Sequence, residues 1–325
     1  MHVTSDTGHT SPPAASELDR FKPRNSKGAQ YCLLASALTV LGIWLSLLDS
    51  YVFWGAGQVL LATAFLQWFI LLHEAGHKTL FHSRTLNTVA GHLAGLLSGF
   101  PYTAWTLIHF RHHKWTGWQD LDATTASLVP RRLKKWERIV INFCWKSWIP
   151  LFSLLYRINN YWNYPRIARY IRPREQQRKI ALNILALLGI YISLALVIGT
   201  ATLLHVFGLA FVLTLIMQEV ILLSQHTHVP TNVSNGRPVR SFPPLEQERY
   251  TRSLQFPSWF SHIILMQFDA HELHHMYVHV PGYDLRKIPY KTHHEVNWWQ
   301  WIRESKRLSG VSFLFEDRNK TGFEL

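Results

Sequence analysis

The chain has 325 residues, of which 48% are hydrophobic and 14 are tryptophans, and its formal net charge at pH 7 is +13. Its basic residues are separated from long apolar runs, which argues against a nucleic-acid-binding protein and favours a membrane protein with a basic face. The two cysteines, Cys32 and Cys144, lie in apolar runs and provide neither a disulfide framework nor a Cys-x-x-Cys site.

Residues 1–27 are rich in Ser, Thr, Pro and charged side chains, which predicts a disordered N-terminal tail. Basic residues at the end of this tail precede the first apolar run, and no small-residue cleavage site stands out after it. The run is therefore interpreted as a membrane anchor and not as a signal peptide that is removed. Residues 28–325 are predicted to form a single integral-membrane domain.

Four apolar runs approach the ~20 residues that a membrane-spanning helix needs. The predicted spans are about 31–48, 52–72, 180–200 and 203–223. Short connections within each pair predict two hairpins, so the expected fold is an all-α membrane protein with four transmembrane helices. The alternative for any one run is a buried helix of a soluble core, but four runs of this length argue against it.

The distribution of basic residues predicts the orientation of these spans. No Lys or Arg occurs between 28 and 77 or between 180 and 236, so the two hairpin tips carry none. By the positive-inside rule the tips face out, and both termini and the rest of the chain face the cytoplasm.

Two further apolar stretches, about 88–107 and 139–156, are interrupted by glycine, proline or lysine. They are predicted to be interfacial or re-entrant helices, although two additional spans would preserve the same sidedness. Residues 297–302 are predicted to be a helix on the membrane surface. A basic cluster before the third span is either a membrane anchor or a docking face for anionic lipid or an acidic electron carrier. Its members are Arg166, Arg169, Arg172, Arg174, Arg178 and Lys179.

Three histidine clusters carry the chemistry of the chain. Positions i, i+3 and i+4 of a helix lie on one face, so each cluster presents its imidazoles in one direction. Eight histidines are too many for one tetrahedral ion and suit two metal ions, and imidazole suits iron, zinc, copper and nickel. A lone histidine would instead be an ordinary polar residue. The predicted ligands are His73, His77, His109, His112, His113, His271, His274 and His275.

Acidic residues beside these clusters have two interpretations. Glu74 and Glu272 are adjacent to predicted ligands, and they either orient an imidazole N–H or are solvated helix-cap residues. Asp120, Asp122 and Asp269 are candidates of the same kind. The sequence leaves these alternatives open.

The clusters and the sequence around them resemble the membrane fatty-acid desaturase superfamily, which also contains hydroxylases, acetylenases and carotenoid ketolases. The resemblance covers roughly residues 35–290. It includes the stretch 112–117 followed by 120–122, the stretch 225–228, and the stretch 274–281. The segment 225–228 and the spacing of the first cluster are similar to acyl-lipid desaturases of the methyl-end type.

This resemblance implies two iron ions (Fe²⁺) held by eight or nine histidines, with four spans under a cytoplasmic helical cap. The ninth ligand would be His226 or His228, which follow the fourth span. The implied reaction introduces a double bond into a fatty-acyl lipid with O2 as co-substrate. Nothing in the chain resembles a cytochrome b5 domain, so electrons are expected from a separate ferredoxin or cytochrome b5.

Three alternatives remain at this level. The first is a fatty-acyl or carotenoid hydroxylase or ketolase on the same scaffold. The second is an intramembrane zinc protease, because residues 73–77 match a zinc-protease signature, although six clustered histidines would then have no role. The third is a metal transporter or store, for which the spans lack matched polar pairs.

Overall fold

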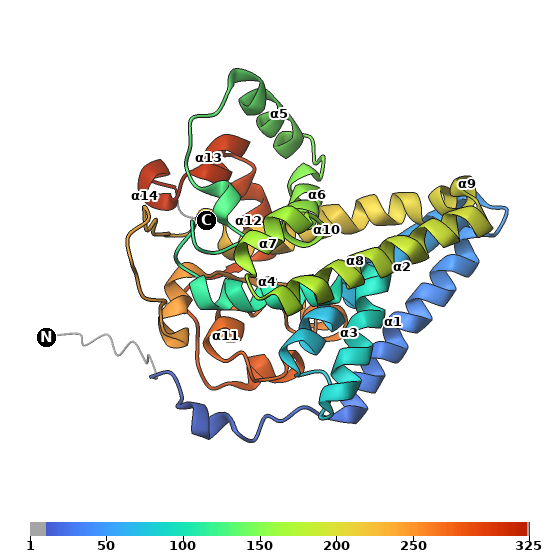
Figure 1. Cartoon of the computed structure of the whole chain (residues 1–325), viewed down its shortest axis with the longest axis horizontal. Coiled ribbons are helices and arrows are strands. Elements are labelled where there is room, and N and C mark those ends of the chain that lie inside the picture. Colours follow the sequence, from blue (N-terminus) through green and yellow to red (C-terminus); the bar gives the residue numbers. More distant parts are fainter. Residues whose placement is uncertain (1–10, 324) are drawn as a thin grey trace, which may run out of the picture.

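The computed structural model describes residues 11–323 and 325, and it is built almost entirely of helices (Figure 1). Four helical segments are long and apolar enough to cross a membrane, or five if one strongly bent pair counts as a single span. This finding confirms the four predicted spans. Their bounds are Asn25–Ser46 (α1), Tyr51–His77 (α2), Arg174–Ile198 (α8) and Thr200–His226, the last of which contains α9 and α10.

The fourth span is divided into α9 (Thr200–Leu203) and α10 (Leu209–His226). The remaining helices are shorter than the spans: α3 (Arg84–Ser98), α4 (Tyr102–Trp115), α5 (Lys135–Lys146), α6 (Leu151–Arg157), α7 (Tyr164–Tyr170), α11 (His271–Met276), α12 (Trp298–Ser305), α13 (Gly310–Phe315) and α14 (Arg318–Thr321). Strands β1 (Ser253–Gln255) and β2 (Glu295–Asn297) pair in parallel, with Leu254 opposite Val296. They tie the segment before α11 to the segment before α12.

Glycine allows α1 and α2 to approach closely. Residues 47–50 join the two helices, and Gly42 of α1 faces Gly57 of α2. A Cβ atom on Gly57 would lie 2.5 Å from Ser46 Oγ and 2.7 Å from the Gly42 carbonyl oxygen. Without an apolar driving force between helices in lipid, such close backbone contact is a main source of helix association.

We expect Gly57→Ala to destabilise the protein by about 1–3 kcal/mol, because the added methyl group meets backbone atoms that cannot move aside. The measurement is thermal unfolding of the detergent-solubilised protein. Gly55→Ala is the matched control, since a Cβ atom there would have no neighbour within 4 Å. Equal unfolding temperatures for the two variants would contradict the proposed close packing.

The Gln58 side chain bonds to backbone groups at an irregular turn in the last span. The helix relaxes into a π-turn at Leu204–Gly208 before α10 begins. Gln58 of α2 donates its amide to the Val206 carbonyl at 2.8 Å and accepts from the Ala210 N–H at 2.9 Å. Backbone groups inside a bilayer have no water to bond, so this buried glutamine lets the irregular turn exist within the span.

The two interrupted stretches are not continuous helices. The expected helix at 88–107 is wrong in extent. Helix α3 ends at Ser98 and is followed by Gly99, which has a left-handed φ of +75°, and α4 begins after Pro101. The expected helix at 139–156 is divided into α5 and α6, whose pair is bent by 109°. Glycine and proline explain the first break, since glycine readily adopts the left-handed conformation and proline cannot continue a helix.

Residues 11–24 have defined contacts, which differs from the disordered tail expected for residues 1–27. Leu18 is buried against residues of α11 and the loop after it. The Arg24 guanidinium lies 3.0 Å from the Asp284 carboxylate, and its backbone N–H donates to the Tyr283 hydroxyl. Residues 1–10 lie outside the described residues. The described part of the predicted tail therefore covers the segment that follows the third histidine cluster.

Candidate metal centre

The helix repeat divides the histidines between two candidate metal sites. At 3.6 residues per turn, position i+4 lies about 40° from position i, whereas position i+3 lies about 60° to the other side. In each of the clusters 109–113 and 271–275, the first and last histidines therefore belong to the same site. The histidine in position i+3 belongs to the second site. Site 1 contains His73, His77, His109, His113 and His274, and site 2 contains His112, His226, His271 and His275.

The ring nitrogens of site 1 converge on one point. His73 Nε2 lies 3.1 Å from His274 Nε2, and His113 Nε2 lies 3.0 Å from the same atom. His77 Nε2 is 2.8 Å from His109 Nε2. Candidate ligand atoms of this site all lie within 4.8 Å of one another. All three clusters thus contribute to one site.

Site 2 is completed by the end of the fourth span. His226, the last residue of α10, places its Nε2 atom 2.7 Å from His271 Nε2. His275 Nε2 is 3.1 Å from His271 Nε2, and the His112 ring centroid is 4.4 Å from that of His226. The same 4.8 Å limit holds for this group.

Of the two alternatives for the ninth ligand, His228 lies outside both candidate sites and His226 lies in site 2. The His228 backbone has a left-handed φ of +59°, so the chain turns away from α10. Its Nδ1 atom lies 3.0 Å from the Glu316 carbonyl oxygen, and its Nε2 atom lies 2.9 Å from Thr321 Oγ1. His228 therefore bonds to the C-terminal segment. The geometry favours His226 as the ninth candidate ligand.

Burial disfavours protonation of five of the clustered imidazoles. It lowers the pKa of His109, His113, His271, His274 and His275 well below the usual value, and neighbouring histidines lower each pKa further. A neutral imidazole has a free lone pair, and a metal binds only this form. The environment that disfavours protonation therefore favours metal binding.

Two of the five acidic candidates hold rings of candidate ligands in position. Glu74 Oε1 lies 3.1 Å from His73 Nδ1, and Asp122 Oδ2 lies 2.7 Å from His112 Nδ1. An Nδ1–H bonded to a carboxylate leaves the Nε2 lone pair free, so that this atom could bind a metal. Burial opposes ionisation of Asp122, but the contacts with His112 and the Thr124 N–H outweigh it, so its pKa lies below the usual value.

The other three acidic candidates contact no ligand ring in the described part of the chain. Asp120 accepts from Ser234, and Asp269 accepts from Ser261 and Arg286. Glu272 accepts from the His294 backbone N–H, and burial raises its pKa to about 7. These carboxylates hold together segments that lie outside the four candidate spans.

The sequence gives no signal for one polar partner of the site. Gln247 Oε1 lies 2.9 Å from His275 Nδ1, while its amide donates to the His113 carbonyl. The residue belongs to a 3₁₀ helix at Pro244–Tyr250, far along the chain from every histidine cluster. It links a ring of site 2 to the backbone of a residue in site 1.

Close packing of α4 on α2 brings the first two clusters together. A Cβ atom on Gly76 would lie 2.5 Å from the Trp105 ring, so only glycine leaves room for this tryptophan. Trp105 stacks on His109 with ring centroids 4.3 Å apart. The third cluster is held by β1, because the Ser253 hydroxyl accepts from the Glu272 backbone N–H.

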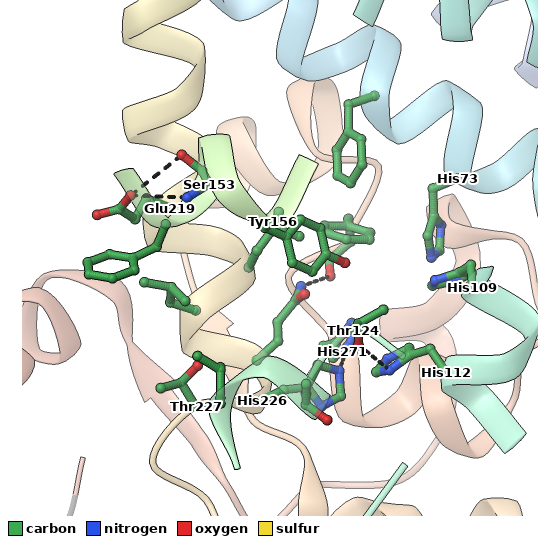
Figure 2. Close-up of a pocket in the computed structure, with 18 of the residues that line it drawn as sticks. His73, His109, His112, Thr124, Ser153, Tyr156, Glu219, His226, Thr227 and His271 are labelled. Carbon is green, nitrogen blue, oxygen red and sulfur yellow. Dashed lines mark hydrogen bonds between the residues drawn. The ribbon is translucent and has the colours of Figure 1, made fainter. Parts of the chain in front are cut away.

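A cavity extends from the histidines into the apolar body of the molecule (Figure 2). His73, His109, His112, His226 and His271 line one end of it. Its wall is otherwise largely apolar or aromatic, with Glu219 and Ser153 at the far end (Figure 2). The apolar part of the wall includes Phe69, Trp105, Leu128, Phe152, Tyr156, Leu222, Leu223 and Phe268. This is the combination expected where a hydrocarbon chain meets a metal centre.

Fold and site together define a helical membrane protein with a histidine-rich candidate metal centre beside an apolar cavity. The family model described as fatty acid desaturase matches residues 48–296. The chain therefore belongs to the fatty acid desaturase family, as its histidine clusters indicate, and it is a membrane-bound oxidoreductase that acts on fatty-acyl chains.

Individual relatives agree with this assignment. The chain is 23% identical over 286 residues to an sn-1 oleoyl-lipid 12-desaturase of Picosynechococcus sp., covering 83% of this chain and 75% of that protein. It is 32% identical over 100 residues to a probable fatty acid desaturase of Sorghum bicolor, covering 31% of this chain and 26% of that protein. Over 124 residues it is 28% identical to an sn-1 acyl-lipid omega-3 desaturase (ferredoxin) of Nostoc sp., covering 37% of this chain and 34% of that protein.

Proposed function

We propose that the chain is a di-iron desaturase that introduces a double bond into the acyl chain of a membrane lipid. The observation that carries the proposal is the convergence of nine histidines into two sites at the end of an apolar cavity. Site 1 offers five imidazoles and site 2 offers four, so each can hold one ion without any carboxylate ligand.

The donor set fits iron. Imidazole nitrogens suit iron as well as zinc. Breaking an unactivated C–H bond requires redox chemistry, which zinc does not have. Iron bound here would supply electron transfer to O2 and the oxidising power for hydrogen removal. The protein's own contribution is to hold the imidazole rings in place through Glu74, Asp122 and Gln247, and to keep bulk water away from the acyl chain.

A zinc-protease mechanism is disfavoured by the environment of Glu74. A general base must reach a metal-bound water, but both oxygens of this carboxylate are occupied. One lies beside His73, and the other accepts from the Thr79 hydroxyl at 2.7 Å and the Gly282 N–H at 2.8 Å. Glu74 is thus a positioning residue.

In the membrane we propose two hairpins with the histidine sites, the helical cap and both termini on the cytoplasmic side. The absence of Lys and Arg from 28–77 and 180–236 supports this orientation by the positive-inside rule. The sites lie at the ends of α2 and α10, away from the α9 end of the spans (Figure 1). The bent pair α5 and α6 then lies at the cytoplasmic interface.

Electrons would come from a separate carrier. The relative from Nostoc sp. is named for ferredoxin, which supports a ferredoxin donor for this chain, and cytochrome b5 is the second candidate. The relatives named for acyl lipids support a lipid-linked acyl chain as the substrate.

The test is mass spectrometry of lipids from a host that expresses the chain together with a ferredoxin or a cytochrome b5. We expect acyl chains that lack two hydrogens with the intact chain and none with His274→Ala, since that residue belongs to site 1. Purified protein should contain about two irons per chain by elemental analysis. Acyl chains that gain one oxygen would identify a hydroxylase instead.

A further inference from the structure

A second cavity opens beside the one at the histidines. Its volume is about 300 Å³, and it lies between α5, α6 and α13. Most of its lining is apolar, including Val140 of α5, Leu155 of α6 and Leu314 of α13. The two cavities share five wall residues, namely Thr124, Leu128, Phe152, Tyr156 and Leu223. They are therefore neighbouring compartments separated by a few side chains.

The helix that borders the outer cavity, α5, has an apolar face that no other element of the described part of the chain covers. Along α5, Trp136, Ile139 and Phe143 are about 60% exposed, with individual values of 62%, 59% and 61%. Such a row of apolar side chains on a helix with a polar opposite face is typical of a helix that lies in the membrane interface. In Figure 1, α5 lies beside the ends of the spans that are remote from α9.

A strongly basic segment, residues 131–138, adjoins the outer cavity and is called its basic rim, and Arg131 is the basic residue of this segment that lines the cavity. Residues 131–138 contain five basic residues and one acidic residue. Arg131 lines the cavity and pairs with the single acid, Glu137, at 2.8 Å, so the carboxylate is neutralised. Arg132, Lys134 and Lys135 are exposed. A row of cations at the end of an interfacial apolar helix attracts the phosphate groups of anionic lipids.

We infer that the outer cavity is a lateral portal through which an acyl chain of an anionic glycerophospholipid passes from the membrane into the site. The lipid phosphate binds at the basic rim, and the chain runs between Val140 and Leu155 towards Phe152, Tyr156 and the histidines. The inference rests on the proposed function and adds to it the place where the acyl chain enters and the anionic headgroup that binds there.

The experiment is photo-cross-linking in membranes that contain the full-length chain. The probe is a phosphatidylglycerol with a diazirine in its sn-1 acyl chain, and the parallel probe is the coenzyme A thioester of the same acid. Labelled peptides are identified by mass spectrometry. We expect the lipid probe to label peptides from 124–128, 136–140 and 151–156, because these segments line the portal.

Variants of residues that line the portal make the test specific. Val140→Trp and Ser127→Trp place a large ring inside the portal from partly exposed positions, so neither disturbs a packed core. Each should reduce lipid labelling about tenfold, the effect of excluding roughly two methylene groups. Ile139→Trp is the matched control, since it adds the same ring on α5 but points away from the portal, and its labelling should equal that of the unmodified chain.

Labelling requires no electron donor and no turnover, so the portal is tested separately from the reaction. Labelling of the portal by the lipid probe, blocked in both plugging variants, supports the portal even if no desaturation is detected. The inference is wrong if the plugging variants keep full labelling, or if only the coenzyme A probe labels these peptides. Retained iron content and elution volume exclude misfolding as the cause of a loss.

Discussion

His226→Ala should abolish desaturation and remove iron from site 2, while His228→Ala should leave both nearly unchanged. His226 Nε2 lies 2.7 Å from His271 Nε2, among the nitrogens of site 2. His228 bonds instead to the Glu316 carbonyl and Thr321. We expect a loss of at least about 100-fold in activity for His226→Ala, since even outer partners of a ligand change activity by 10–100-fold.

Two measurements separate these variants. Elemental analysis of purified protein should show roughly one iron per chain for His226→Ala and about two for His228→Ala. Thermal unfolding should show a modest loss for His228→Ala, because the C-terminal segment loses a hydrogen-bonded anchor of about 1 kcal/mol. If His228→Ala lost iron and His226→Ala kept it, the assignment of the ninth ligand would be reversed.

This pair of residues also shows where sequence analysis reaches its limit. Both histidines follow the fourth span, and the distance to Pro230 favours His226 without excluding His228. The decision comes from the left-handed turn at His228 and from acceptors some 90 residues further along the chain. The spans, in contrast, were predictable because apolar length and charge distribution are local properties.

The same distinction applies to the partners of the ligands. Helical spacing predicts that residues 271–275 present three imidazoles in one direction, whereas the structure divides them between two candidate sites, His274 in site 1 and His271 and His275 in site 2. It does not predict Gln247, whose contact with His275 depends on how a 3₁₀ helix packs against α11. The breaks in the two interrupted stretches were partly predictable, since Gly99 and Pro101 signal a break but not the course of the chain after it.

Among the carboxylates, Asp122→Asn should cost much more activity than Asp120→Asn, although the two residues are only two positions apart. Asp122 is buried and contacts His112 Nδ1 at 2.7 Å, whereas Asp120 contacts Ser234 in the loop after α10. We expect Asp122→Asn to reduce activity and iron affinity by about 10–100-fold, the usual effect of losing a partner that orients a metal ligand.

The reason lies in the donors that surround this carboxylate. One oxygen of Asp122 faces the His112 Nδ1–H, and the other accepts from the Thr124 N–H and hydroxyl, each at 2.9 Å. An asparagine has only one acceptor atom, so its NH2 group must face one set of donors. If it faces His112, the ring must place its proton on Nε2, the atom that would bind the metal.

Iron content and kinetics test this argument together. A positioning role predicts that Asp122→Asn loses iron from site 2 and lowers kcat, with little change in KM for the acyl lipid, because the carboxylate does not line the cavity. Asp120→Asn should retain both irons and full kcat. Equal behaviour of the two variants would mean that Asp122 supports the fold of the loop and not the orientation of His112.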